Sequence, residues 1–146
     1  MTTIERSALL PYAAEQIFDL VADIEQYPDF LEGCVGAEIL EQTEGTVVAT
    51  LKLSRAGITH SFTTSNALHP PERMALALVD GPFQTFSGEW TFRALGESAC
   101  KTSLRLQFEL SSGLANIAAG RLFDRVASDL VDAVVTRANQ QLSQSA

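Results

Sequence analysis

The segment 58–68 places polar side chains on the same face as apolar ones. His60, Thr64 and Asn66 are separated by even numbers of residues, so on a strand they point the same way. An imidazole, a hydroxyl and an amide can orient a mostly apolar ligand that carries a hydroxyl or a carbonyl group. The same groups can instead be hydrogen-bonded to nearby backbone, because buried polar groups normally find partners. The spacing leaves both interpretations open, with Arg121 as one more polar candidate at the edge of the last helix.

Motifs for nucleophilic or nucleotide chemistry are absent from the sequence. It holds no GxSxG, no HExxH and no glycine-rich phosphate loop. The carboxylates Asp19 and Asp23 share a helical face that we expect to be solvated, which is the usual place for charged side chains. We therefore expect no catalytic residue and no enzymatic activity.

The two cysteines, Cys34 and Cys100, stand alone in the sequence. Neither belongs to a CxxC pair, and neither has a histidine at the spacing of a zinc site. Unpaired cysteines are usually buried and behave as small hydrophobic residues. The sequence therefore predicts two buried free thiols, with no disulfide and no metal.

Hydrophobic periodicity gives the order of the elements that must position these side chains. It predicts a strand over 3–10, a helix over 14–21, a short helix or turn over 24–31, strands near 35–39, 47–54, 58–68, 74–79, 85–93 and 101–110, and one long helix that ends near 142. In the strand near 35–39 we expect Val35, Ala37 and Ile39 to face inward. Pro28 disfavours the helical conformation at Tyr27, so we expect the stretch 24–31 to be a short helix or turn that follows a break.

Antiparallel strands with one apolar face need a cover, and the last helix is the only predicted element large enough to provide it. The sequence thus predicts an α+β fold in which a curved, seven-stranded antiparallel sheet wraps around a long C-terminal helix. No repeat or linker divides the 146 residues, so we expect one domain over 1–146, structured over about 4–142.

Composition narrows the class of partner. The formal net charge is −8, the wrong sign for a protein held by many phosphate contacts, so free nucleic acid is not expected as the main partner. No apolar run is long enough to span a membrane, and the first ten residues lack the pattern of a signal peptide. We therefore expect a cytoplasmic protein.

The inward faces of the predicted sheet carry large aromatic side chains, whereas the last helix begins with the small residues Ala115, Ala118, Ala119 and Gly120. Gly120 has two explanations: close packing against an aromatic ring, or room left for a guest molecule in the hollow of the sheet. For the second case, the predicted ligand-binding residues are His60, Phe62, Thr64, Leu76, Leu78, Phe86, Trp90, Phe92, Leu106, Phe108, Ala119, Leu122 and Val126.

Short motifs follow one another in a characteristic order over most of the chain. They are Tyr27, Pro28, Phe30, Leu31 and Cys34; Ala56, Gly57 and Ile58 with Phe62 and Thr63; Val79 to Phe83 with Gly88, Trp90 and Phe92; and Gly120, Arg121 and Phe123. Together they resemble the family of the bacterial ribosome association toxin RatA and the mitochondrial coenzyme Q-binding protein. The chain departs from the family pattern at Glu32, where relatives usually have proline, and at Ala13, where a serine often caps the first helix.

The resemblance implies a helix-grip fold of the START (Bet v 1-like) type and no intrinsic catalysis. The coenzyme Q-binding side of the family implies that the cavity holds ubiquinone or a related isoprenoid lipid and supports respiration, with no other cofactor. The toxin side implies a regulator that binds the large ribosomal subunit and blocks subunit association. The wider superfamily adds a third alternative, a polyketide cyclase or dehydratase, for which His60 and Asn66 are the candidate residues.

Charge favours the apolar ligand over ribosomal RNA. The chain has only two lysines, Lys52 and Lys101, and its eight arginines are scattered along the sequence. An RNA contact would need a local basic patch, for which Arg121, Arg125 and Arg137 on the last helix are the candidates.

Overall fold

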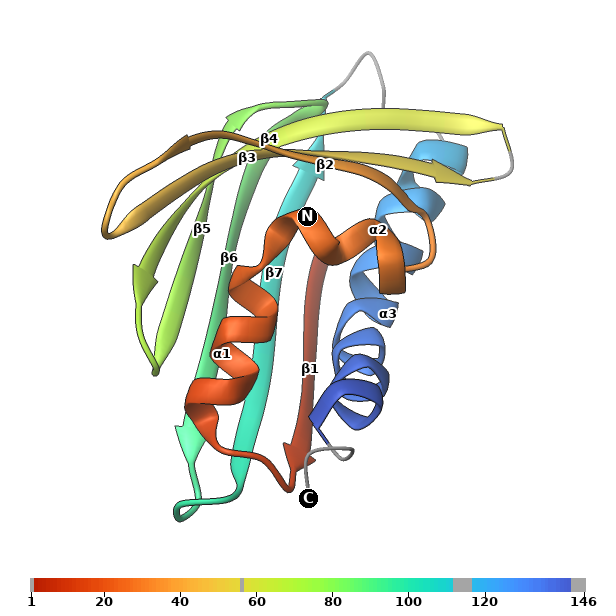
Figure 1. Ribbon diagram of the computed structural model, residues 1–146. Helices are drawn as coiled ribbons and strands as arrows, with labels where there is room; N and C mark the ends of the chain where they lie inside the picture. Colours follow the sequence, from red (N-terminus) through yellow and green to blue (C-terminus); the bar gives the residue numbers. More distant parts are fainter. Residues whose placement is uncertain (1, 56, 112–116, 143–146) are drawn as a thin grey trace.

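The computed structural model describes residues 2–55, 57–111 and 117–142, without the side chains of 117–119. Its elements (Figure 1) are β1 (Thr2–Leu10), α1 (Ala14–Ala22), the 3-10 turn η1 (Ile24–Gln26), α2 (Tyr27–Phe30), β2 (Cys34–Gln42), β3 (Thr46–Arg55), β4 (Ile58–His69), β5 (Arg73–Asp80), β6 (Phe83–Ala94), β7 (Cys100–Leu110) and α3 (Ile117–Leu142). This order confirms the predicted succession of elements.

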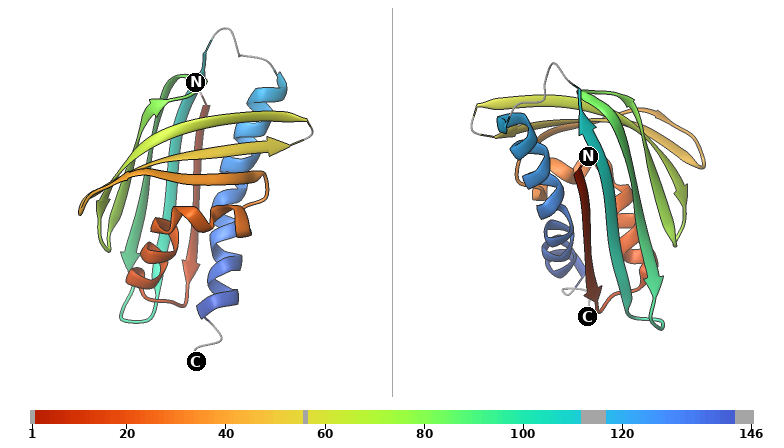
Figure 2. Two further views of the ribbon diagram at one scale, coloured as in Figure 1. Left: turned by 45° about the horizontal axis from the view of Figure 1, so that its top comes forward. Right: turned by 180° about the vertical axis from the view of Figure 1, so that it is seen from behind.

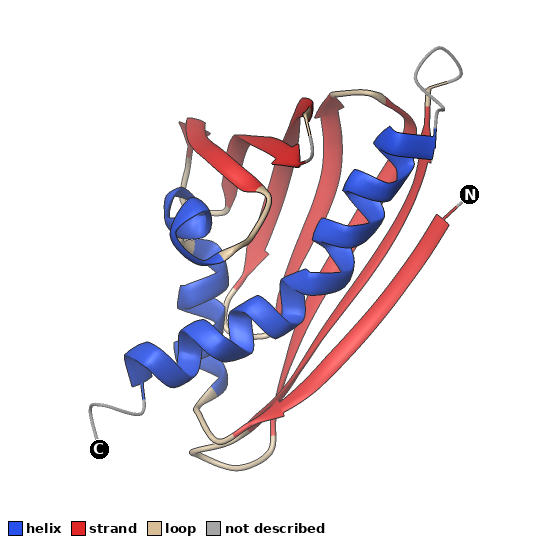
Figure 3. Cartoon of the chain, turned by 90° about the vertical axis from the view of Figure 1, so that its right-hand side faces the viewer, coloured by secondary structure: helices blue, strands red, loops and turns tan. Residues whose placement is uncertain are grey.

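The strands form one antiparallel sheet in the order β1-β7-β6-β5-β4-β3-β2. Strands β2 to β7 follow one another as a meander, and β1 pairs with β7, so the first and last strands of the chain are neighbours. The sheet is strongly bent: β2, β3 and β4 cross one end of the molecule, while α3 runs beside β1 (Figure 2). Viewed from the side, α3 lies along the concave face over most of its length (Figure 3). The predicted curved sheet around a long helix is confirmed.

Alternation along the strands explains which face is buried. In β7, Thr102, Leu104, Leu106 and Phe108 are buried, whereas Lys101 and other alternate side chains face away from the core. The same period holds in β3, where the buried side chains are Val47, Ala49 and Leu53. A period of two puts every second side chain on the concave face, where the helices cover it.

Strand β2 departs from the predicted alternation. A β-bulge between Cys34 and Gly36 shifts the register, so that Cys34 pairs with Leu53 while Ala37 pairs with Leu51. The bulge turns Val35 outward, where it is 56% exposed, and the expectation that Val35 faces inward is wrong. An extra residue in one strand reverses the facing of the side chains beyond it, and the hydrophobic pattern alone does not show where this occurs.

The expectation that Pro28 keeps Tyr27 out of the helical conformation is wrong. Tyr27 is the first residue of α2 and has helical dihedral angles, φ −54° and ψ −40°. Pro28 lies in the first turn of that helix, where its missing N–H costs no hydrogen bond. The helical conformation is interrupted at Asp23, between α1 and η1, with φ −82° and ψ 70°. Leu31 ends α2 by donating its N–H to the Tyr27 carbonyl.

Candidate functional site

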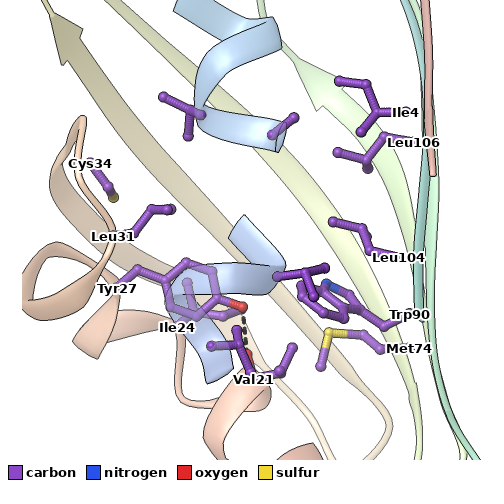
Figure 4. Close-up of a cluster of buried hydrophobic side chains, with 14 of the residues drawn as sticks. Ile4, Val21, Ile24, Tyr27, Leu31, Cys34, Met74, Trp90, Leu104 and Leu106 are labelled. Carbon is purple, nitrogen blue, oxygen red and sulfur yellow. Dashed lines mark hydrogen bonds between the residues drawn. The ribbon is translucent and has the colours of Figure 1, made fainter. Parts of the chain in front are cut away.

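The concave side of the sheet encloses a cavity of about 80 Å³ between the strands, the short helices and α3. Its walls come from the segment that includes η1 and α2, from strands β3 to β7 and from α3. The lining residues are Ile24, Tyr27, Leu31, Ala49, Leu51, Leu53, Phe62, Thr64, Asn66, Met74, Leu76, Phe83, Phe86, Trp90, Leu106, Phe108, Phe123, Val126, Ala127 and Leu130. In Figure 4, Trp90 and Met74 extend from the sheet into the interior, and Tyr27, Ile24 and Leu31 approach it from the short helices.

A cluster of phenylalanine rings closes the cavity near the start of α3. Phe83 lies at the centre of this cluster, with ring-centroid distances of 4.7 Å to Phe123, 5.1 Å to Phe86 and 5.6 Å to Phe62. Phe108 adds a fifth ring, 5.7 Å from Phe83. Most of these pairs meet edge-to-face or tilted, the arrangements that aromatic quadrupoles favour. The cluster therefore gives the cavity an aromatic wall contributed by β4, β6, β7 and α3.

The polar groups of the cavity come from β4, α2 and β6. Thr64 and Asn66 are both buried, and the Thr64 hydroxyl donates a hydrogen bond of 2.8 Å to Oδ1 of Asn66. The Tyr27 hydroxyl donates to the backbone carbonyl of Val21 at 2.6 Å (Figure 4). Trp90 contributes an indole ring that is almost wholly buried. The lining is thus apolar with a few fixed polar groups.

Two ionisable groups near the cavity are held in their neutral forms. Burial raises the pKa of the Tyr27 phenol well above its ordinary value, and the nearby Cys34 and Asp23 raise it further. Burial also raises the pKa of the Cys34 thiol, and this outweighs the lowering that hydrogen bonding with the Gly36 backbone contributes. A buried group resists charging because the charged form loses its hydration. Cys34 and Cys100 are both free and buried, as predicted.

Many of the residues predicted to bind a ligand do meet at the cavity. Those that line it are Phe62, Thr64, Leu76, Phe86, Trp90, Leu106, Phe108 and Val126. Their convergence is a geometric finding, and their contact with a ligand stays a prediction. Asn66, singled out from its spacing, also lines the cavity.

The other predicted residues lie elsewhere. His60, Leu78, Phe92 and Leu122 are not among the described lining residues. The ring of His60 stacks at a tilt on Phe123, with centroids 5.7 Å apart, and Phe92 packs between Phe18 and Trp90. These residues support the walls from behind or at the rim. The side chain of Ala119 lies outside the described residues, as do those of Ala115 and Ala118.

The prediction missed the residues that the short helices contribute, and with them Met74 and Phe83. Ile24, Tyr27 and Leu31 reach the cavity because η1 and α2 fold over the open side of the sheet. Their apolar character was visible in the sequence, but periodicity over such short elements does not show which face is inward. On α3 the lining face is formed by Phe123, Ala127 and Leu130 together with Val126, rather than by Leu122.

Gly120 does not pack closely against an aromatic ring. Among the residues that the structure describes, a Cβ built on Gly120 would meet only Cδ1 of Leu110, at 3.8 Å, which is an ordinary van der Waals contact. The first explanation offered for this glycine is therefore wrong, because a methyl group fits at the site.

The candidate basic patch on α3 is largely engaged in contacts within the protein. Arg125 forms an ion pair of 2.9 Å with Asp129, and the guanidinium of Arg137 lies 5.4 Å from the centre of the Phe30 ring. Within the described part of the chain, no group of three or more His, Cys, Asp or Glu side chains is arranged to hold a metal ion. None of the described helices is long and apolar enough to cross a membrane.

Comparison with known proteins places this architecture in a family. Residues 10–135 match the family model described as polyketide cyclase / dehydrase and lipid transport. The ribosome association toxin RatA of Vibrio cholerae is 49% identical over 140 residues, which cover 96% of this chain and 97% of the relative.

Two more distant proteins are similar, one in sequence and the other in fold. The mitochondrial coenzyme Q-binding protein COQ10 homolog B of Xenopus laevis is 24% identical over 138 residues, covering 92% of this chain and 57% of that protein. The crystal structure of the Zhui aromatase/cyclase from Streptomyces sp. R1128 superposes with a TM-score of 0.81 at 20% identity, covering 97% of each chain. At that identity the likeness concerns the fold, which is the helix-grip arrangement of START-like proteins. The chain therefore belongs to the polyketide cyclase / dehydrase and lipid transport family, on the branch that contains the ribosome association toxin RatA.

Proposed function

We propose that this chain binds a hydrophobic lipid of the isoprenoid quinone class in its cavity and carries or presents it, in support of respiration, without catalysing a reaction. The observation that carries the proposal is the lining of the cavity. Aromatic and aliphatic side chains form its walls, and Tyr27, Thr64, Asn66 and Trp90 supply the polar groups. An apolar pocket with a few placed polar groups suits a neutral ring that bears oxygen atoms. The relationship to a coenzyme Q-binding protein points to the same class of ligand.

The volume of the cavity means that a wall must move when a ligand binds. Pockets for ligands of drug size hold about 300–1,000 Å³, and a cavity of about 150 Å³ admits benzene. The present cavity, at about 80 Å³, is smaller than either. The cheapest movement is that of α3, because the helix keeps its own backbone hydrogen bonds while it shifts. Displacing a strand would instead break the ladder that runs through the whole sheet.

The chemistry of the lining favours binding over cyclisation. The described lining residues carry no carboxylate, imidazole or amine, which are the usual general acids and bases. The phenol of Tyr27 is held protonated and bonds to Val21. His60, the imidazole considered for a cyclase, lies outside the lining.

The single tryptophan, Trp90, provides a direct test because it lies in the cavity wall. We expect decylubiquinone, a ubiquinone with a short saturated tail, to quench its fluorescence in a saturable manner. Ala127→Leu places a larger side chain in the cavity and is expected to abolish saturable quenching. Ala133→Leu is the matched control: Ala133 lies on the same helix, half-buried and outside the lining, so this variant is expected to bind as the wild type does.

Quenching that rises linearly with quinone concentration, and equally in all three proteins, would contradict the proposal. Collisional quenching behaves in this way and needs no site. Isothermal titration calorimetry with the same quinone gives an independent measurement, since a bound ligand releases or absorbs heat in proportion to the occupied sites.

A second candidate function, association with the ribosome, is favoured by the name of the RatA relative at 49% identity. The outer face of the sheet offers a place for such a contact. Arg93 on β6 lies directly opposite Lys101 on β7, and no ion pair is recorded for either among the described residues. Like charges opposite one another destabilise a sheet, so an acidic partner would relieve their repulsion.

Sedimentation in sucrose gradients tests this candidate. We expect the wild-type chain to co-sediment with the large ribosomal subunit and to lower the fraction of joined ribosomes. The double variant Arg93→Glu with Lys101→Glu is expected to lose both effects, whereas Lys52→Glu, on β3, retains them. Unchanged profiles with the wild-type chain in excess would remove the candidate.

A further inference from the structure

We propose that the cavity recognises its ligand as a hydrogen-bond acceptor, through the side-chain amide of Asn66 and the indole N–H of Trp90. The inference rests on the proposed function and adds a selection rule to it. A ring that carries carbonyl oxygens, such as an oxidised quinone, matches these donors. The hydroxyl oxygens of the reduced quinol also accept hydrogen bonds, but more weakly than carbonyl oxygens do, and they bring hydrogens that need acceptors of their own.

The Asn66 amide is hydrogen-bonded to its neighbour on the same strand. Thr64 and Asn66 are two residues apart on β4, so both side chains project from the concave face. The Thr64 hydroxyl donates to Oδ1 of Asn66 at 2.8 Å. Oδ1 is thereby engaged as an acceptor, and the amide nitrogen, Nδ2, is the end of the side chain left to act on a ligand.

Trp90 adds a second donor on the same wall. Asn66 pairs with Leu76 on β5, and Leu76 pairs in turn with Gly88, two residues before Trp90 on β6. The two donors are therefore separated by a single strand, and both side chains line the cavity. An indole nitrogen carries a hydrogen and has no free lone pair, so Trp90 can only donate.

Neither donor has an acceptor among the described residues. No hydrogen bond is recorded for Nδ2 of Asn66 or for Nε1 of Trp90. Neither nitrogen is sealed within the protein, since Nη1 of Arg55 is the one enclosed side-chain nitrogen or oxygen without a partner in the described part of the chain. Asn66 is 4% exposed and Trp90 is 1% exposed, and both side chains line the cavity.

The remaining polar group in the wall does not compete for the ligand as a donor. The Tyr27 hydroxyl gives its hydrogen to the Val21 carbonyl, and burial keeps the phenol protonated. Backbone groups of β4 are paired with β3 on one side and β5 on the other. The unpaired N–H groups among the described residues that line the cavity are therefore those of Asn66 and Trp90.

The test compares three ligands of similar shape by calorimetry: decylubiquinone, its quinol kept reduced under anaerobic conditions, and decylbenzene, which has no oxygen. We expect the wild-type chain to bind the quinone about tenfold more tightly than the quinol, the effect of one well-made hydrogen bond. Asn66→Leu, of similar volume, is expected to weaken quinone binding by about tenfold and to leave decylbenzene binding unchanged. Thr63→Val is the matched control on the outward face of β4, where Thr63 bonds to Thr50.

Equal affinity of the wild-type chain for quinone, quinol and decylbenzene would overturn this inference and leave the proposed carrier function standing. An Asn66→Leu variant that loses quinone and decylbenzene binding to the same extent would also overturn it, because the loss would then come from packing. If the wild-type chain binds none of the three ligands, the proposed function fails as well. The comparison of ligands on the wild-type chain requires no variant, so it is decisive even where Asn66→Leu does not fold.

Discussion

Burial and hydrogen bonding both affect the ionisation of the Tyr27 side chain. Its ring lines the cavity, its hydroxyl bonds to Val21, and burial raises the pKa of its phenol above the ordinary value of about 10. The folded chain thus keeps the phenol protonated at a pH where the unfolded chain releases the proton. A raised pKa in the folded state makes stability fall as the pH rises above the unfolded value.

Tyr27→Phe removes both the hydrogen bond to Val21 and the ionisable phenol, and the two effects appear at different pH. The variant leaves the Val21 carbonyl without its donor, and we expect the free energy of unfolding at pH 8 to fall by about 1–2 kcal/mol. Above pH of about 10, the wild-type chain loses stability as the unfolded phenol ionises, and the variant is expected to lose less. Urea unfolding followed between pH 8 and 11 measures both effects. A variant whose stability falls with pH as steeply as that of the wild type would show that Tyr27 is not the source.

Ala13 begins α1 without a side-chain cap. It has extended dihedral angles, as a capping residue does, and the side chain of Gln16 accepts a hydrogen bond from its N–H at 3.0 Å. Half of the reciprocal capping box is therefore present. Ala13→Ser supplies the missing oxygen, and we expect it to raise the free energy of unfolding by about 1 kcal/mol. Thermal unfolding measures this gain as a shift of about 3 °C, and an unchanged midpoint would mean that the backbone cannot accept the cap.

At the scale of elements, the strands with regular alternation could be predicted and the irregular ones could not. In β7 each second residue from Thr102 to Phe108 is apolar or small, and the structure buries those side chains. The bulge at Val35 depends on how β2 pairs with β3. The hydrophobic pattern of β2 alone does not reveal that pairing. The orientation of α2 depends likewise on tertiary contacts, because a helix of one turn has too few residues to show a period.

Gly88 keeps β6 close to its neighbours, and a larger residue there is expected to be costly. A Cβ on Gly88 would overlap Cδ2 of Leu106 and lie 3.2 Å from Cδ1 of Leu76, both on flanking strands. We expect Gly88→Ala to lower the free energy of unfolding by about 1–3 kcal/mol, the usual cost of overpacking. Gly120→Ala is the matched control, because a methyl group fits there and alanine favours the helix by up to about 1 kcal/mol. Urea unfolding of both variants checks the opposite signs, and a loss of similar size in each would contradict the packing argument.

For the whole molecule, the sequence indicated which side chains face the interior, whereas the existence and the size of a hollow between the sheet and the helix required coordinates. Phe62, Phe86, Trp90 and Phe108 converge as their alternation indicated. The remaining volume of about 80 Å³ depends on how closely α3 and the short helices approach those rings. The volume of the cavity depends on how side chains from segments distant in sequence fit together. A pattern of apolar and polar residues along the chain does not contain that information.

A cavity that serves a ligand is expected to cost the empty protein some stability. A void of about 80 Å³ corresponds to as much as about 2 kcal/mol, at about 24 cal/mol for each Å³. Ala127→Leu fills part of this space from α3, and we expect it to raise the free energy of unfolding of the ligand-free chain by about 1 kcal/mol. Thermal unfolding with and without decylubiquinone measures the stability of the empty and the ligand-bound chain. Without quinone, Ala127→Leu is expected to unfold at a higher temperature than the wild type. Adding quinone is expected to raise the midpoint of the wild type and to leave that of Ala127→Leu unchanged. If Ala127→Leu destabilises the empty chain, α3 cannot accommodate a larger side chain at the cavity, and the same closeness would argue against the displacement of α3 that quinone binding requires.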